Sequence, residues 1–202
     1  ASPAAYTAFA NAVVENITAA GLSTPIGAGV GTWDPAWREY ATSYAQNTSL
    51  DFVDLHVYPI NFDFLPRLWD LADLAQAGGK DVAIGEAWMY KASDAELSSG
   101  VYFDDIFVRD AYDFWAPLDS RFLWDMVNYS HAEGLAFLSP YWSKFFHAYL
   151  DYDQVAGWNY QQITLAANQA AAQAMVENRL SETGRAYAVA IGGNPGTLPT
   201  PP

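Results

Sequence analysis

The chain has 202 residues, enough for one domain with a hydrophobic core, and its hydrophobic content of 51% excludes a disordered chain. A net charge of −14 repels nucleic acid phosphates and anionic lipid headgroups, and the apolar runs are too short and interrupted for a transmembrane helix. We therefore expect neither a nucleic acid nor a membrane partner. The absence of cysteine excludes disulfides and thiolate metal sites.

The first elements that the sequence predicts are a helix and a short strand. Ser2 suits the N-cap of a helix and Pro3 its first position. Apolar residues then recur at helical spacing until Gly21, a residue type that can end a helix. A strand is predicted over residues 26–31, where three glycines alternate on one face. These glycines indicate close packing rather than a ligand site.

A second helix, a clear strand and a third helix are predicted next. Asp34-Pro35 marks the start of the second helix in the same way as Ser2 marks the first. Residues 51–59, DFVDLHVYP, predict a strand. Asp63 is a candidate N-cap for the third helix, which two consecutive glycines would stop.

The second half of the chain predicts two more strands and two more helices. Residues 81–88, DVAIGEAW, predict a strand, whereas residues 89–116 are rich in Tyr, Phe and Asp and give no clear pattern. A helix is predicted over residues 118–133, a strand over 135–142, and a long Ala-rich helix over about 160–179.

The order of these elements is a helix followed by four strand–helix units. Such alternation predicts an α/β protein with a parallel sheet and right-handed crossovers, and four units are half of a (β/α)8 TIM barrel, strands five to eight. We expect residues 1–187 to form the C-terminal half of a TIM-barrel catalytic domain. Residues 188–202 are expected to be a Pro/Gly/Thr-rich tail or linker.

A polar face on the strand at 51–59 is the first candidate site. Asp54, His56 and Tyr58 alternate with apolar residues, so they share one face. Polar groups on a buried strand need partners, and TIM barrels place their chemistry at the carboxyl ends of the strands. The alternative interpretation is an amphipathic edge strand whose polar side chains lie in water.

Glu86 is the second candidate. It ends an apolar strand, directly after Gly85 and close to Trp88. A carboxylate at the end of a buried strand beside aromatic residues is suited to act as a nucleophile or a base. The alternative is that Glu86 begins a solvent-exposed loop.

Three motifs together resemble a family. These are LHVYP (55–59), GEAW (85–88) and SPYW (139–142), and they are similar to motifs on strands six, seven and eight of the retaining TIM-barrel glycosidases that include cellulases, mannanases and β-galactosidases. The resemblance covers residues 3–185 in the order of elements. It implies that Glu86 is the nucleophile and that His56 and Tyr58 line the site, with Tyr58 hydrogen-bonded to Glu86.

The same resemblance implies a set of substrate-binding residues. Trp142 corresponds to the aromatic platform at the end of strand eight, and Trp33 and Trp88 are further candidates for stacking on sugar rings. Asp54 is a candidate substrate contact. The implied substrate is a β-linked oligo- or polysaccharide, the implied mechanism is double displacement, and no cofactor or metal is needed. The Thr/Pro tail and the acidic, aromatic composition favour a secreted or periplasmic protein.

One element of the family pattern is missing. Retaining glycosidases use two carboxyl groups about 5–5.5 Å apart, and the family's second one, the acid/base, is a Glu in an Asn-Glu pair on strand four. No such pair occurs in this chain. The acid/base is expected on a separate N-terminal half-barrel chain or segment. The alternatives are that two identical copies pair into a barrel, or that Asp34 or Asp54 serves as a substitute acid.

Two other functions are compatible with the sequence. A non-catalytic carbohydrate-binding protein on a degenerate barrel is the alternative closest to the glycosidase, and a four-stranded α/β interaction module is the second. The three histidines do not form a zinc pattern. The acidic stretches FDDIFVRD and LDYDQ lack the spacing of an EF-hand, which favours solvated loops over calcium sites.

Overall fold

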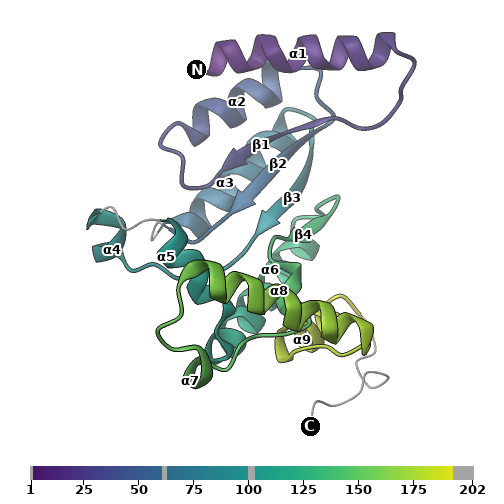
Figure 1. Ribbon diagram of the computed structural model, residues 1–202. Coiled ribbons are helices and arrows are strands. Elements are labelled where there is room, and N and C mark those ends of the chain that lie inside the picture. The colour runs from purple at the N-terminus through teal and green to yellow at the C-terminus, as the bar shows by residue number, and fades with distance from the viewer. Residues whose placement is uncertain (1, 61–62, 100–102, 193–202) are drawn as a thin grey trace. The chain divides into compact units, whose positions relative to one another are not determined.

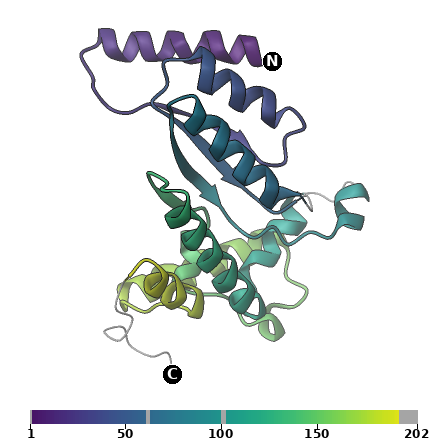
Figure 2. The same cartoon turned by 180° about the vertical axis from the view of Figure 1, so that it is seen from behind.

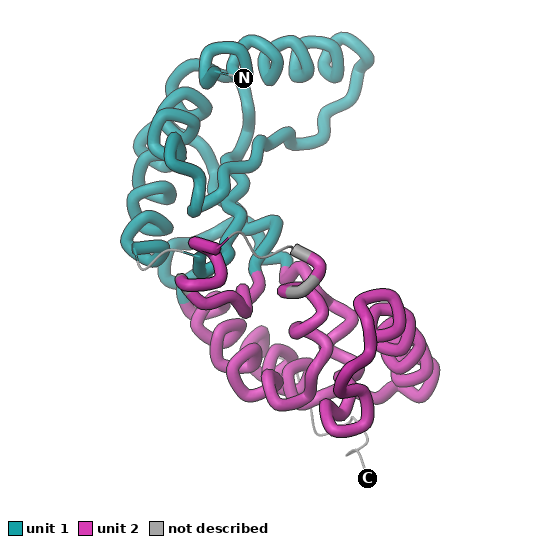
Figure 3. The backbone as a smooth tube through the Cα atoms, turned by 60° about the vertical axis from the view of Figure 1, so that its left-hand side comes forward, with its two compact units in different colours: residues 1–87, 129–139 teal, residues 88–128, 140–202 magenta. Residues whose placement is uncertain are grey.

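The computed structural model divides the chain into two compact units (Figure 3). Unit 1 consists of residues 1–87 and 129–139, and unit 2 of residues 88–128 and 140–202. The residues that the structure describes are 2–60, 63–99 and 103–192.

Unit 1 is built on a four-stranded parallel sheet in the order β1-β2-β3-β4 (Figure 1), which confirms the α/β class. The strands are β1 (Gly27–Gly31), β2 (Phe52–Val57), β3 (Asp81–Ala87) and β4 (Leu138–Pro140). The last is much shorter than predicted. The chain already pairs with β3 before β4 begins, because the Ala136 amide donates a hydrogen bond to the Val82 carbonyl and the Ile84 amide donates one to the Phe137 carbonyl.

The helices of unit 1 are α1 (Pro3–Ala19), α2 (Trp37–Asn47) and α3 (Phe64–Ala77). Helices α2 and α3 lie over one face of the sheet (Figure 2). That face is apolar, since the side chains of Val53, Leu55 and Val57 are fully buried against them. Buried Leu68 and Leu71 contribute the matching face of α3. This packing leaves the alternate side chains of β2 on the opposite face of the sheet.

Two predicted helix starts in unit 1 are confirmed and one is corrected. Ser2 caps α1 by accepting a hydrogen bond from the Ala5 amide. By contrast, α2 begins at Trp37 rather than at Asp34-Pro35, because the Asp34 carboxylate accepts from the Ala36 amide at 2.7 Å and closes a turn before the helix. At the third helix Asp63 occupies the N-cap position but makes no capping hydrogen bond. Its carboxylate is held instead by Arg67.

The start of the long Ala-rich helix in unit 2, α8 (Tyr160–Val176), is also confirmed. Asn159 and Gln162 form a reciprocal capping box at its beginning. The helix predicted at 118–133 is present as well, as α6 (Ala116–Ala132), which starts in unit 2 and ends in unit 1.

The segment 89–116, which gave no clear pattern, contains short helices. They are α4 (Asp94–Ser99), α5 (Phe103–Phe107), η1 (Val108–Ala111) and η2 (Asp113–Trp115). Three further elements follow β4 besides α8: η3 (Ser143–Phe146), α7 (Tyr152–Val155) and α9 (Glu182–Ala190). The sequence did not predict α9, and the predicted boundary at residue 187 lies inside it. Residues 193–202 of the predicted tail lie outside the described residues.

A buried ion-pair cluster lies in the core of unit 2. The Lys91 side chain is fully buried, with its ammonium 2.9 Å from Asp110 and also in contact with Asp119. The Trp88 indole N–H donates to Asp110 at 3.3 Å, and the Tyr149 phenol donates to Asp119 at 2.9 Å. Every charged member therefore has a polar partner, which a buried charge requires.

No helix among the described residues combines the length and the apolar character that crossing a bilayer requires.

Candidate functional site

The polar face of β2 is half-buried in the sheet. Burial alternates strictly along the strand, with Asp54 and His56 between the fully buried apolar residues. Because β2 pairs with β1 on one side and β3 on the other, it is an interior strand. The alternative of an edge strand with its polar side chains in water is therefore wrong.

A β-bulge decides the direction of Glu86. The pairing of β2 with β3 runs from Asp54↔Ala83 and Leu55↔Ile84 directly to His56↔Glu86, which leaves Gly85 without a partner in the register. Simple alternation would place Glu86 on the same face as Ile84, beneath the helices. The extra residue moves Glu86 to the polar face, beside His56. Bulges commonly re-aim a side chain in this way next to active sites.

The bulge brings four polar side chains together at the carboxyl ends of β2 and β3. The Tyr58 phenol donates a hydrogen bond to Oε2 of Glu86 at 3.1 Å. Nδ1 of His56 lies 3.6 Å from the same oxygen, and Nε2 of His56 lies 3.2 Å from Oδ2 of Asp54. The Glu86 side chain remains 33% exposed, so it is held by two partners and still open to solvent.

Asp54 is held from a second direction. Its Oδ1 accepts a hydrogen bond from the backbone N–H of Gly85, the bulge residue. Gly85 has to be a glycine, because a Cβ at this position would overlap the Asp54 carboxylate. The glycine is required here because the backbone of Gly85 passes close to a side chain, and not because its φ angle is unusual.

Trp33 lies beside this cluster in unit 1. Its ring packs edge-on against that of Tyr58, with centroids 5.3 Å apart. Glycines of β1 make room for both neighbours: a Cβ on Gly31 would lie 2.9 Å from the Trp33 indole, and one on Gly29 would lie 2.9 Å from Nε2 of His56. The prediction that these glycines permit close packing is confirmed.

The electrostatics of the site centre on His56. Its hydrogen bond to Asp54 raises the pKa of His56 above the ordinary value of 6.5, burial opposes this rise, and the charges of Asp54 and Glu86 support it. The imidazole consequently tends to keep its second proton. A protonated ring donates at both nitrogens, which suits a position between two carboxylates.

Two predicted aromatic site residues belong to unit 2. Trp88 is only 1% exposed and packs against Phe145 and Phe146, so its ring offers no free face for a sugar in this structure. Trp142 is half-buried after β4, in edge-on contact with Phe107 and with the Lys144 ammonium 4.9 Å from its ring centre. The sequence could not distinguish the buried indole from the partly exposed one.

The described residues contain no group of three or more His, Asp or Glu side chains that could hold a metal ion. The chemistry available at the polar cluster is that of Glu86 itself. A carboxylate held by a phenol and an imidazole, and open on its remaining side, can attack an electrophilic carbon or accept a proton.

Comparison of the chain with protein-family models, with curated proteins and with solved structures finds no match. A function for this chain therefore has to rest on its motifs and on the geometry of this site.

Proposed function

We propose that this chain is the C-terminal half of a TIM-barrel retaining glycoside hydrolase and that Glu86 is its nucleophile. The observation that carries the proposal is the position of the Glu86 carboxylate. A bulge turns it onto the polar face at the carboxyl end of β3, where Tyr58 and His56 hold it. The carboxyl ends of parallel strands are where TIM barrels build their active sites.

In the proposed reaction a carboxylate oxygen of Glu86 attacks the anomeric carbon of a β-linked sugar. The bond from that carbon to the leaving oxygen breaks, and a covalent glycosyl-enzyme forms. An acid protonates the leaving oxygen and then, as a base, takes a proton from the water that releases the sugar. The N-terminal half-barrel supplies this second carboxyl group about 5–5.5 Å from Glu86, on a separate chain or segment.

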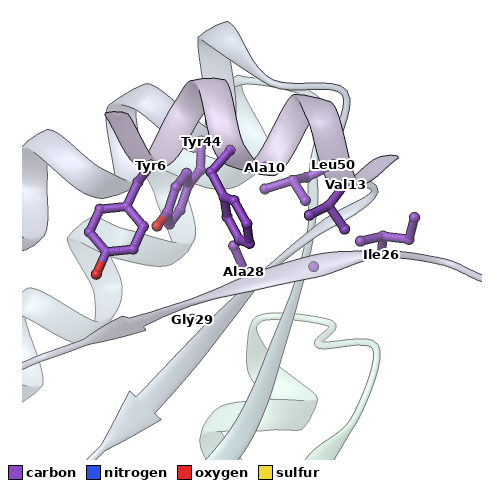
Figure 4. A pocket seen from close by; sticks show the side chains of 10 residues that line it. Tyr6, Ala10, Val13, Ile26, Ala28, Gly29, Tyr44 and Leu50 are labelled. Atoms are coloured by element: carbon purple, nitrogen blue, oxygen red, sulfur yellow. The ribbon is translucent and has the colours of Figure 1, made fainter. Parts of the chain in front are cut away.

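The open edge of the sheet supports an incomplete barrel. Among the described residues, β1 pairs with β2 alone and its other edge has no partner strand. A pocket of about 250 Å³ lies between α1 and this edge strand (Figure 4). Its lining is mostly apolar and includes Ala10, Val13, Ile26, Ala28 and Leu50. An unpaired edge beside an apolar pocket is a surface that a further strand of a barrel would cover.

The remaining site residues have proposed roles in the same mechanism. Tyr58 and His56 orient the carboxylate of Glu86 and contact the substrate. Trp33, which packs on Tyr58, stacks on a sugar ring, and the SPYW motif alone supports the same role for Trp142 of unit 2, whereas buried Trp88 has no such role. The substrate is a β-linked oligo- or polysaccharide, the mechanism needs no cofactor, and the enzyme works outside the cell.

The test is covalent labelling by a panel of 2,4-dinitrophenyl 2-deoxy-2-fluoro-β-glycosides. Dinitrophenolate leaves without a proton, so the first step needs the nucleophile but not the absent acid. Fluorine at C2 slows release of the sugar, and the adduct persists. Native mass spectrometry should show one added 2-deoxy-2-fluoroglycosyl group, and peptide mapping should place it on Glu86.

Two variants make the labelling specific. Glu86→Gln should remain folded and take no label, whereas Glu15→Gln, a matched change at an exposed position of α1, should be labelled like the wild type. Absence of an adduct with every sugar of the panel, or an adduct that maps elsewhere, contradicts the proposed role of Glu86.

A further inference from the structure

We infer that Asp54 is a positioning residue: it fixes the Gly85 bulge and the His56 ring, and through both it sets the direction of the Glu86 carboxylate. This role replaces the substrate contact that the sequence suggested for Asp54. The inference rests on the proposed function for the chemistry of Glu86, but the contacts of Asp54 can be tested without a substrate.

Both carboxylate oxygens of Asp54 are already engaged within unit 1. Oδ1 accepts from the Gly85 amide, and Oδ2 lies 3.2 Å from Nε2 of His56. The side chain is 22% exposed, less than that of Glu86. With a contact on each oxygen inside the sheet, the carboxylate is fixed in place. Asp54 directs one oxygen to the backbone of β3 and the other to a neighbouring ring.

The first contact controls Glu86 through the backbone. Gly85 directly precedes Glu86 and is the residue that interrupts the register between β2 and β3. A bulge can relax when nothing holds its unpaired residue, and relaxation would return Glu86 toward the face that the helices cover. The bond from the Gly85 amide to Asp54 holds the bulge in place, and the missing Cβ of Gly85 is what allows this contact.

The second contact controls Glu86 through His56. The ring spans the two carboxylates, with Nε2 toward Asp54 and Nδ1 3.6 Å from Glu86. When Asp54 binds Nε2, the ring can turn only by losing that bond, so Nδ1 stays directed at Glu86. The arrangement is that of an outer carboxylate that orients a histidine, which in turn orients the reacting group.

Two substitutions separate the contacts. Asp54→Asn keeps an oxygen for the Gly85 amide but turns an NH2 group toward Nε2 of His56, which removes the charge and favours a neutral ring. Asp54→Ala removes both contacts. Asp81→Asn is the matched control, because it makes the same change of charge on an exposed residue at the opposite end of β3.

The experiment is NMR on the whole chain, with the His56 signals assigned through His56→Gln. In Asp54→Asn the pKa of His56 should fall, while Asp81→Asn should leave it unchanged. In Asp54→Ala the Gly85 amide should also exchange with deuterium faster than in the wild type. An unchanged His56 titration in Asp54→Asn overturns the inference, and so does an unchanged Gly85 exchange rate in folded Asp54→Ala. If Asp54→Ala does not fold, Asp54→Asn decides both contacts: its neutral amide oxygen accepts from Gly85 less strongly than a carboxylate does, so the Gly85 amide should still exchange faster than in the wild type, and an unchanged rate overturns that part of the inference.

Labelling by the 2-fluoroglycosides tests the effect on Glu86. Asp54→Asn should react about tenfold to a hundredfold more slowly than the wild type, as expected when an outer residue that orients a reacting group is lost. Equal rates would overturn the inference. A wild type that takes no label contradicts the proposed function of Glu86 instead, and the His56 and Gly85 measurements still decide the role of Asp54.

Discussion

The phenol of Tyr58, the residue that follows β2, donates a hydrogen bond to Oε2 of Glu86 near the end of β3 at 3.1 Å. The two residues are 28 positions apart in the chain. Tyr58 is in turn supported by the edge-on contact of its ring with Trp33. A fixed donor of this kind gives the Glu86 carboxylate a charge-assisted hydrogen bond and limits its rotation.

Tyr58→Phe isolates the contribution of this hydroxyl. The substitution keeps the ring that contacts Trp33 and removes the hydroxyl that donates to Glu86. Hydrogen bonds to charged groups contribute about 1.5–3 kcal/mol, and we expect the labelling rate to fall about tenfold to a hundredfold. The measurement is the rate constant of covalent labelling. Tyr160→Phe, at an exposed position of α8, should keep the wild-type rate, and equal rates for both variants would exclude a role for the Tyr58 hydroxyl.

Gly85→Ala tests the bulge by stability. The new Cβ would overlap the Asp54 carboxylate, which is anchored at both oxygens and cannot move freely. We expect the free energy of unfolding in urea to fall by about 1–3 kcal/mol, the usual range for overpacking. Gly29→Ala should cost less, because its Cβ would lie 2.9 Å from Nε2 of His56, a smaller overlap than that between a Cβ on Gly85 and the Asp54 carboxylate. Equal stability of Gly85→Ala and the wild type would contradict the close contact between the Gly85 backbone and the Asp54 carboxylate.

His56 should make the stability of unit 1 depend on pH. Its folded pKa is raised, chiefly by the hydrogen bond to Asp54, so the folded state binds the proton more tightly than the unfolded state. The stabilisation is therefore fully present below the unfolded pKa of about 6.5 and is lost as pH rises through the folded pKa. Urea unfolding of the wild type and His56→Gln at pH 5.5 and 8.5 measures it. The free energy of unfolding of the wild type should exceed that of His56→Gln by more at pH 5.5 than at pH 8.5. A difference that grows with pH would contradict this prediction.

Much of unit 1 was predictable because its patterns are local. Alternation along residues 51–59 correctly separated the buried face from the polar face of β2, and the Ser2-Pro3 pair correctly located the start of α1. The pairing of Tyr58 with Glu86 also followed from the motifs, although the function attached to them remains a proposal.

The bulge at Gly85 was not predicted, since alternation alone assigns Glu86 to the face of Ile84. The available signal was the glycine itself, which inside a strand often marks a bulge. Long-range partners were equally hidden. Nothing near Lys91 in the sequence indicates that residues 19 and 28 positions away neutralise it, and nothing near Trp88 indicates that its ring is buried.

The buried cluster of unit 2 gives the last prediction. Burial raises the pKa of Asp110 to about 6, although the neighbouring Lys91 ammonium opposes the rise. The ordinary pKa of this carboxyl is 3.8, so the folded state favours the protonated acid more than the unfolded state does. The corresponding stability is present below about pH 4 and is lost as pH rises through about 6, by about 2–3 kcal/mol for a shift of this size.

Asp110→Asn, which keeps an oxygen for the Trp88 N–H, should remove this loss. We expect urea unfolding at pH 4.5 and 7.5 to show the wild type weakening relative to Asp110→Asn as pH rises. Asp153→Asn, which changes an exposed carboxylate of α7, should retain the wild-type dependence. Parallel pH dependences of Asp110→Asn and the wild type would show that Asp110 is already ionised in the folded protein and that Lys91 outweighs the effect of burial.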